Sequence, residues 1–178
     1  MVKLIHVIIA GKERPEKHLS GIAKFKADKV LLFSDGINSE QVTDTLEQMG
    51  TEYKIIPCDN TYLNVYRKAK EEAVAALVDD TVVAINVSTG PRIIQSAIED
   101  AFRLQLISFY RNNNVISSAA FRYFVPDSKK ENIKVAPFWN IYSEDHNDIL
   151  ETLAETGKPL TMKNIWESIL LEGGGHYF

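Results

Sequence analysis

Strand-like and helical segments alternate along most of this chain, and that order restricts its fold more than any other feature. The expected strands are runs rich in Val, Ile, Leu or Phe, at Lys3–Ala10, Lys29–Ser34, Glu52–Pro57, Thr81–Asn86 and Val115–Phe121. Helical periodicity lies between them, at Arg14–Lys26, Ser39–Met49, Leu63–Leu77 and from Ile93 onward. Strands that alternate with helices in this way predict βαβ units and a parallel sheet.

The expected strands are almost continuously apolar, which is typical of a sheet whose two faces are both covered by helices. A chain of 178 residues with 45% hydrophobic and 25% charged residues is long enough for one sizeable core. We therefore expect an α/β fold, a Rossmann-like three-layer sandwich with a mainly parallel sheet. After it, Arg122–Val125 and Ile133–Phe138 resemble a strand pair around the polar turn Pro126–Asn132.

The last part of the chain predicts a small helix-turn-helix-like appendage. Asp145–Thr156 is amphipathic, and a second helix is expected over Met162–Leu171. The predicted domains are therefore residues 1–140 and residues 141–178. Acidic residues outnumber basic ones in this tail, which opposes binding to duplex DNA. A packing or dimerisation module is the alternative to a DNA-binding one.

Charge and cysteine content exclude several classes of partner. The net charge of −4 argues against broad attraction to duplex DNA or to an anionic membrane. The apolar run Leu4–Ala10 is too short to span a bilayer. Cys58 is the single cysteine and the four histidines are scattered, so we expect no disulfide, no metal and no cofactor, and a reducing cytoplasm fits best.

Ligands of open α/β sheets bind beyond the carboxyl ends of the strands, near the point where the strand order reverses. The loop Ala10–Pro15 follows the first expected strand, and the turn Asn86–Arg92 follows the fourth. Ser34 and Asp35 lie at the end of the second expected strand and are predicted to form a rim of the site. The alternative is an ordinary turn, for which Asp-Gly is a common sequence. Neither a Gly-x-Gly-x-x-Gly fingerprint nor a Gly-Lys-Ser/Thr sequence is present, which disfavours ordinary NAD and ATP enzymes.

The turn Asn86–Arg92 is predicted to hold phosphate. Its small residues let a ligand approach the backbone, the next helix offers unpaired N–H groups, and Arg92 adds a planar cation. Ser88 and Thr89 supply hydroxyl donors, while Gly11 and Gly90 permit close contact. The alternatives are an ordinary strand-turn-helix connection, with Thr89 as a helix cap, and a Lys12 that is merely solvated.

The segments Leu4–Lys12, Ala27–Asp35 and Ala84–Arg92 resemble CARF domains, the CRISPR-associated Rossmann fold, over roughly residues 1–140. In that family, the loop after the first strand and an Asn-x-Ser/Thr-x-Gly turn after the fourth bind cyclic oligoadenylate across a homodimer. Many relatives have a second glycine and a lysine where this chain has Pro91 and Arg92. Arg92 keeps the positive charge of that lysine, and Pro91 makes the backbone stiffer than glycine would. The ligand-binding residues that we predict are Ala10, Gly11, Lys12, Ser34, Asp35, Asn86, Ser88, Thr89, Gly90, Pro91 and Arg92.

The size and layout of the chain are similar to those of small stand-alone CRISPR ring nucleases with a C-terminal winged-helix-like segment. That resemblance implies metal-independent cleavage of cyclic tetra-adenylate to linear products with 2′,3′-cyclic phosphate ends, which switches off type III CRISPR signalling. The ribose 2′-hydroxyl attacks its own phosphate, so the protein has to position the ring and stabilise charge. Lys12 and Arg92 are the predicted catalytic cations.

Two other functions stay open at this point. A sensor or transcription regulator would bind the ring unchanged and alter DNA affinity through its tail. The chain would otherwise be a CARF-like scaffold, or a fragment of a longer regulator whose DNA-binding part lies beyond Phe178. Hexa-adenylate would satisfy the same two-fold symmetry as tetra-adenylate. His176, after three glycines, is either a mobile lid residue or part of a frayed tail, whereas His6 is expected in the core.

Overall fold

The computed structural model of the protein describes residues 2–36, 39–59, 61–78, 80–113, 119–128 and 131–137. Helices and strands alternate through most of these ranges. In chain order they are β1 Lys3–Ile9, α1 Pro15–Phe25, β2 Lys29–Ser34, α2 Glu40–Gln48, β3 Glu52–Pro57, α3 Tyr62–Ala76, β4 Thr81–Asn86, α4 Arg92–Asn113, β5 Ala119–Phe124 and β6 Lys134–Pro137.

The strands form one sheet of order β3-β2-β1-β4-β5-β6, in which only the β5–β6 pair is antiparallel. Val7 of β1 pairs with Leu31 of β2 on one side and with Ile85 of β4 on the other. The strand order therefore reverses between β1 and β4, which is where ligands bind in open sheets of this type. The predicted Rossmann-like α/β class is confirmed.

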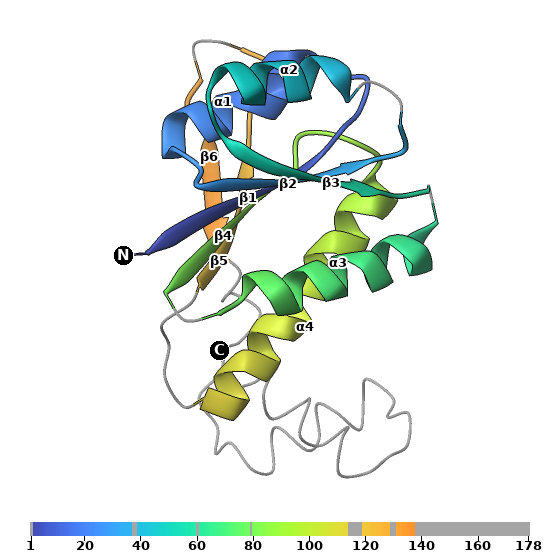
Figure 1. The fold of residues 1–178 in the computed structure, drawn as a ribbon, viewed down its shortest axis with the longest axis vertical. Helices are drawn as coiled ribbons and strands as arrows, with labels where there is room; N and C mark the ends of the chain where they lie inside the picture. The colour runs from blue at the N-terminus through green and yellow to red at the C-terminus, as the bar shows by residue number, and fades with distance from the viewer. Residues whose placement is uncertain are drawn as a thin grey trace, which may run out of the picture. The chain divides into compact units, whose positions relative to one another are not determined.

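Helices cover both faces of the sheet. Figure 1 shows α1 and α2 on one face and α3 and α4 on the other. Four consecutive residues of β2, Val30 to Phe33, are buried, so its side chains are covered whichever face they point to. This double coverage is the physical reason for the continuous apolar runs. One core cluster lies between the sheet and the first two helices, and it contains Ile8, Ala10, Ile22, Val30, Leu32, Val42 and Leu46.

An aromatic cluster closes the α1 face over β5. A Cβ on Gly21 would lie 2.2 Å from the Tyr123 ring, so α1 packs directly against that side chain. His6 is fully buried, as expected, and its Nδ1 lies 3.2 Å from the Tyr123 hydroxyl. Its Nε2 has no hydrogen-bond partner among the described residues. Burial lowers the pKa of His6 to about 4, so the ring is neutral at pH 7.

The sequence prediction is wrong about the strands near residue 121. It divides Val115–Phe121 from Arg122–Val125, whereas β5 runs without a break from Ala119 to Phe124. Arg122 does not interrupt the strand, because its backbone pairs with β4 and β6 while its guanidinium lies 3.3 Å from Glu99 of α4. The expected antiparallel pairing with the following strand is confirmed.

The predicted appendage, with His176, lies outside the described residues, so the boundary near residue 140 stays a prediction. None of the helices in the described ranges combines the length and the apolar character that crossing a membrane requires.

Candidate functional site

A cavity opens at the carboxyl ends of β1 to β4, where the strand order reverses. Its volume is about 450 Å³. Every one of these strands contributes through the loop that follows it. The cavity is lined by Ile9, Ala10, Gly11, Lys12, Glu13, Asp35, Cys58, Gly90, Pro91 and Ile94.

The turn after β4 is held in shape by its own side chains. Asn86 is fully buried, its Nδ2 donates to the Lys17 carbonyl at 2.8 Å, and its Oδ1 accepts from the Ser88 amide at 2.8 Å. The Ser88 hydroxyl accepts from the Val125 amide at 2.6 Å. These two predicted ligand residues therefore tie the turn to α1 and to the end of β5, and neither lines the cavity.

Gly90 brings the turn against β1. Its φ is +77°, and a Cβ there would lie 2.3 Å from Cγ2 of Ile9, so no other residue fits without displacement. The Gln95 side-chain amide donates to the carbonyls of Thr89 and Gly90 at 2.9 and 3.0 Å. The turn is thus fixed from α4 as well as from β1 and α1.

Thr89 does not act as the cap of α4 in this structure. Its side chain is fully buried, and Oγ1 has no hydrogen-bond partner among the described residues. The carbonyl of Pro91 instead accepts from the amides of Ile94 and Gln95, at 3.0 and 3.1 Å. The sequence alternative of a Thr89 cap is therefore wrong, and the hydroxyl remains a donor without a partner in the described region.

The loop after β1 folds back onto α1 through His18. The Gly11 amide donates to His18 Nε2 at 3.3 Å, and His18 Nδ1 lies 3.2 Å from the Arg14 carbonyl. These partners require the proton on Nδ1 and a lone pair on Nε2, which is the neutral ring. Burial lowers the pKa of His18, which favours the same neutral form.

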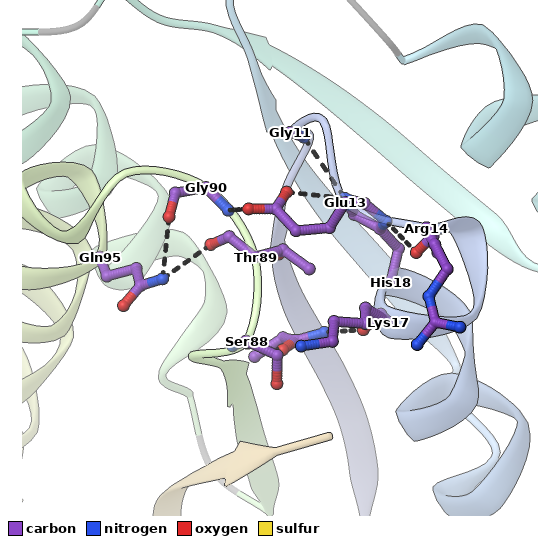
Figure 2. A network of polar contacts seen from close by, with 10 residues as sticks. Gly11, Glu13, Arg14, Lys17, His18, Ser88, Thr89, Gly90 and Gln95 are labelled. Atoms are coloured by element: carbon purple, nitrogen blue, oxygen red, sulfur yellow. Dashed lines mark hydrogen bonds and ion pairs between the residues drawn. The ribbon is translucent and has the colours of Figure 1, made fainter. Parts of the chain in front are cut away.

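Glu13 connects the two loops, as Figure 2 shows. Its Oε1 accepts from the Gly90 amide at 3.1 Å, and its Oε2 lies 4.0 Å from His18 Nε2. Sequence reasoning missed this residue. The signal for it was a lone carboxylate between Lys12 and Arg14 in a glycine-containing loop, which the expectation of a basic pocket passed over.

The two predicted catalytic cations have different positions. Lys12 is exposed and lines the cavity, whereas Arg92 is exposed at the start of α4 and is not among the lining residues. The basic side chains of Arg14 and Lys17, at the start of α1, contact Asp127 and do not line the cavity. Lys17 Nζ lies 2.7 Å from Asp127, whose pKa this contact lowers, and Arg14 lies 3.9 Å from the same carboxylate.

The rim from β2 and β3 supplies one charge and one thiol. Asp35 is exposed and lines the cavity, while the Ser34 hydroxyl is buried and accepts from the Gly36 amide at 3.0 Å. Burial raises the pKa of the Cys58 thiol to about 11, so it is protonated at pH 7 and unsuited to nucleophilic attack.

The structure thus separates the predicted ligand residues into three groups. Six of them line the cavity, namely Ala10, Gly11, Lys12, Asp35, Gly90 and Pro91. Four are buried or half-buried and do not line it, namely Ser34, Asn86, Ser88 and Thr89. Arg92 belongs to neither group. Within the described ranges, no cluster of three metal-binding side chains occurs.

Comparisons with known proteins show the fold. No protein-family model matches this sequence, and no protein of curated function matches it. The structure is similar to that of Can2 from Sulfobacillus thermosulfidooxidans in complex with cyclic tetra-adenylate, with a TM-score of 0.52 and 14% identity. The match covers 94% of this chain but only 57% of that one, so this chain spans little more than half of its length.

A second, weaker similarity, to 4-diphosphocytidyl-2C-methyl-D-erythritol synthase from Anaerococcus prevotii DSM 20548, has a TM-score of 0.34 and 10% identity.

Proposed function

We propose that this protein binds a cyclic oligoadenylate, specifically cyclic tetra-adenylate, at the cavity between the loops after β1 and β4. The observation that carries the proposal is the convergence of two glycine-containing loops and Lys12 at the point where the strand order reverses. The resemblance of both loops to CARF motifs supports it. The similarity in fold to Can2, whose structure contains cyclic tetra-adenylate, supports it further.

The size of the cavity argues for two copies of the chain around one ligand. A volume of about 450 Å³ fits one drug-sized molecule. A ring of four nucleotides is larger, and it has a two-fold axis of its own. A symmetric homodimer would place two such cavities around that axis, with each subunit supplying one β1 loop and one β4 turn. The homodimer is therefore part of the proposal.

The proposed activity is metal-independent cleavage of the ring to linear products with 2′,3′-cyclic phosphate ends, which would switch off type III CRISPR signalling. The ribose 2′-hydroxyl would be the nucleophile, so the protein needs only to align it with the phosphate and stabilise the developing charge. Lys12, which lines the cavity, is the residue that we propose to supply this positive charge. Arg92 would join it only if ligand binding or a second subunit brought the α4 start to the ring.

One observation favours the alternative function, a sensor that binds the ring intact. Among the described residues that line the cavity, Lys12 is the one cation, and the thiol of Cys58 is protonated at pH 7. Such a site has few groups that would act only in the transition state, and binding energy alone does not accelerate cleavage. A sensor would pass the signal to a partner or to its tail.

Incubation of the protein with cyclic tetra-adenylate in EDTA tests both functions, with chromatography and mass analysis of the products and calorimetry of binding. Lys12→Ala should weaken binding by about tenfold, because it removes one charge-assisted contact to phosphate. Lys70→Ala, at an exposed lysine of α3, is the matched control and should leave binding unchanged. Native mass spectrometry should find one ring per two chains.

The products separate the outcomes. Linear di-adenylate with a cyclic phosphate end would establish a ring nuclease. Intact ring with tight binding would establish a sensor. Absence of binding to cyclic tetra-adenylate and to cyclic hexa-adenylate would contradict the proposal.

A further inference from the structure

We propose that Glu13 is an internal anion, which occupies the phosphate position at the Gly90 amide in the free protein and must leave when a ligand phosphate binds there. The inference rests on the proposed function for the identity of the ligand. The contact between Glu13 and Gly90, however, belongs to the free chain and can be tested without any ligand.

The position of the Glu13 carboxylate is that of a bound anion. Its Oε1 accepts from the Gly90 amide at 3.1 Å, just before α4 begins at Arg92. Backbone amides at the start of a helix favour negative charge, because the helix dipole is positive there. The amide that sequence analysis assigned to a ligand phosphate is therefore already used by a carboxylate of the same chain.

The second carboxylate oxygen is poorly satisfied. Oε2 of Glu13 is buried and has no hydrogen-bond partner in the described part of the chain. The nearest polar ring atom, His18 Nε2, is 4.0 Å away and already accepts from the Gly11 amide, so it presents a lone pair and no proton. Burying a charged oxygen without a partner is unfavourable, which makes this carboxylate easier to displace than a fully bonded one.

Glycine at position 11 keeps this space open. A Cβ on Gly11 would lie 2.1 Å from Glu13 Oε2 and 3.0 Å from the Gly90 amide nitrogen. The space beside Gly11 is therefore taken up by the Glu13 carboxylate group, which a side chain at position 11 would displace.

The need to displace Glu13 weakens the binding of ligands that make a single phosphate contact more than that of ligands that make several. A mononucleotide would gain one phosphate contact and lose the carboxylate contact, so its net gain is small. A cyclic oligonucleotide gains contacts through several phosphates and bases at once. In a symmetric homodimer, one ring would displace both copies of Glu13, whereas one mononucleotide would displace a single copy. Removing the carboxylate should therefore raise the affinity for the ring by two such contributions and the affinity for a mononucleotide by one.

Calorimetry of Glu13→Ala and Glu13→Gln with two ligands tests this prediction. Glu13→Ala should raise the affinity for AMP by about tenfold and that for cyclic tetra-adenylate by about a hundredfold, if each displaced carboxylate contributes one charge-assisted hydrogen bond. Glu13→Gln should act in the same direction and less strongly, because its amide oxygen can still accept from Gly90. Glu16→Gln removes an exposed charge on the first turn of α1 and is the matched control, with little expected effect.

A ligand-free measurement keeps this inference separate from the proposed function. The Gly90 amide resonance in a ¹⁵N–¹H NMR spectrum should move upfield in Glu13→Ala and stay in place in Glu16→Gln. An unmoved Gly90 resonance in Glu13→Ala, with the remaining spectrum folded, would overturn the inference. The Glu13→Gln spectrum answers the same question if the alanine variant does not fold.

The ligand results then have distinct meanings. Wild-type protein that binds cyclic tetra-adenylate with an affinity unchanged in Glu13→Ala would overturn the role of Glu13 and leave the proposed function standing. Tighter binding of AMP by Glu13→Ala, with no binding of cyclic oligoadenylates by any variant, would overturn the proposed function and support the internal anion.

Discussion

The turn after β4 and the loop after β1 lie at the same edge of the sheet and treat their polar groups in opposite ways. In the β4 turn, the side chains of Asn86 and Ser88 form hydrogen bonds within the protein, to α1 and to the end of β5. In the β1 loop, Lys12 is exposed, and Glu13 reaches across to the other loop. The β4 turn therefore acts as a frame, and the β1 loop carries the charges to which the proposed function assigns roles in ligand binding.

This difference means that stability and ligand affinity should respond to different substitutions. A change in the frame should lower the free energy of unfolding whether or not a ligand is present. A change in the exposed charges of the β1 loop should alter affinity and leave unfolding nearly unaffected. The following predictions test that division, beginning with the largest effect.

Gly90→Ala should have the largest effect on the frame. The new Cβ would overlap Ile9 of β1, 2.3 Å away, in a backbone conformation with φ of +77° that alanine disfavours. Strain and overpacking together should lower the free energy of unfolding by about 4 kcal/mol. Urea denaturation followed by circular dichroism measures it.

Gly36→Ala is the matched control, because Gly36 also has a positive φ, of +87°, but open space around it. It should cost about 1 kcal/mol, from backbone strain alone. Equal losses in the two variants would contradict the idea that β1 and the β4 turn are in close contact.

Acid should weaken the frame through His6, which contacts Tyr123 beneath the β4 turn. The pKa of His6 is about 4 in the folded state against 6.5 unfolded, so the unfolded chain binds a proton first as the pH falls. Stability from the neutral ring is complete above pH 6.5 and is lost toward pH 4, by about 2.5 kcal/mol between pH 7 and 4.5.

Denaturation midpoints of wild-type protein and His6→Gln at pH 7 and 4.5 would measure this term. The variant should lose less stability on acidification, because the slope from His6 is gone. His18 has a lowered pKa too and should leave a residual slope of the same sign in both proteins. If stability falls equally with pH in the two proteins, His6 does not contribute to the acid sensitivity.

Asn86→Ala should have a smaller effect on the frame. It leaves the carbonyl of Lys17 and the amide of Ser88 without their part-buried hydrogen bonds to Asn86, which should cost about 2 kcal/mol in thermal or urea unfolding. Lys12→Ala, in the β1 loop, should stay within about 0.5 kcal/mol of wild type in the same assay. A destabilising Lys12→Ala, or a neutral Asn86→Ala, would break the division between frame and charged loop.

Much of the fold could be predicted from the sequence, because it follows from local patterns. The bounds of β2, β3 and β4 coincide with the predicted apolar runs, and Pro15 begins α1 as its fixed φ favours. The position of the cavity could be predicted at the level of loops, because loops that follow parallel strands gather at one edge of the sheet. The sequence prediction divided β5 in two at Arg122, because a charged residue in an apolar run indicates the end of a strand when its ion-pair partner, Glu99, is unknown.

What the sequence determined by itself is the series of strands and helices, together with the two glycines that let backbones approach closely. Only the tertiary structure decided that Glu13 reaches Gly90, 77 residues away in the chain, and that Arg92 is not among the residues lining the cavity. The physical reason is that periodicity acts over a few residues, whereas the meeting of two loops depends on strand order. Once β1 and β4 are neighbours, a carboxylate and an amide from distant segments share one small space.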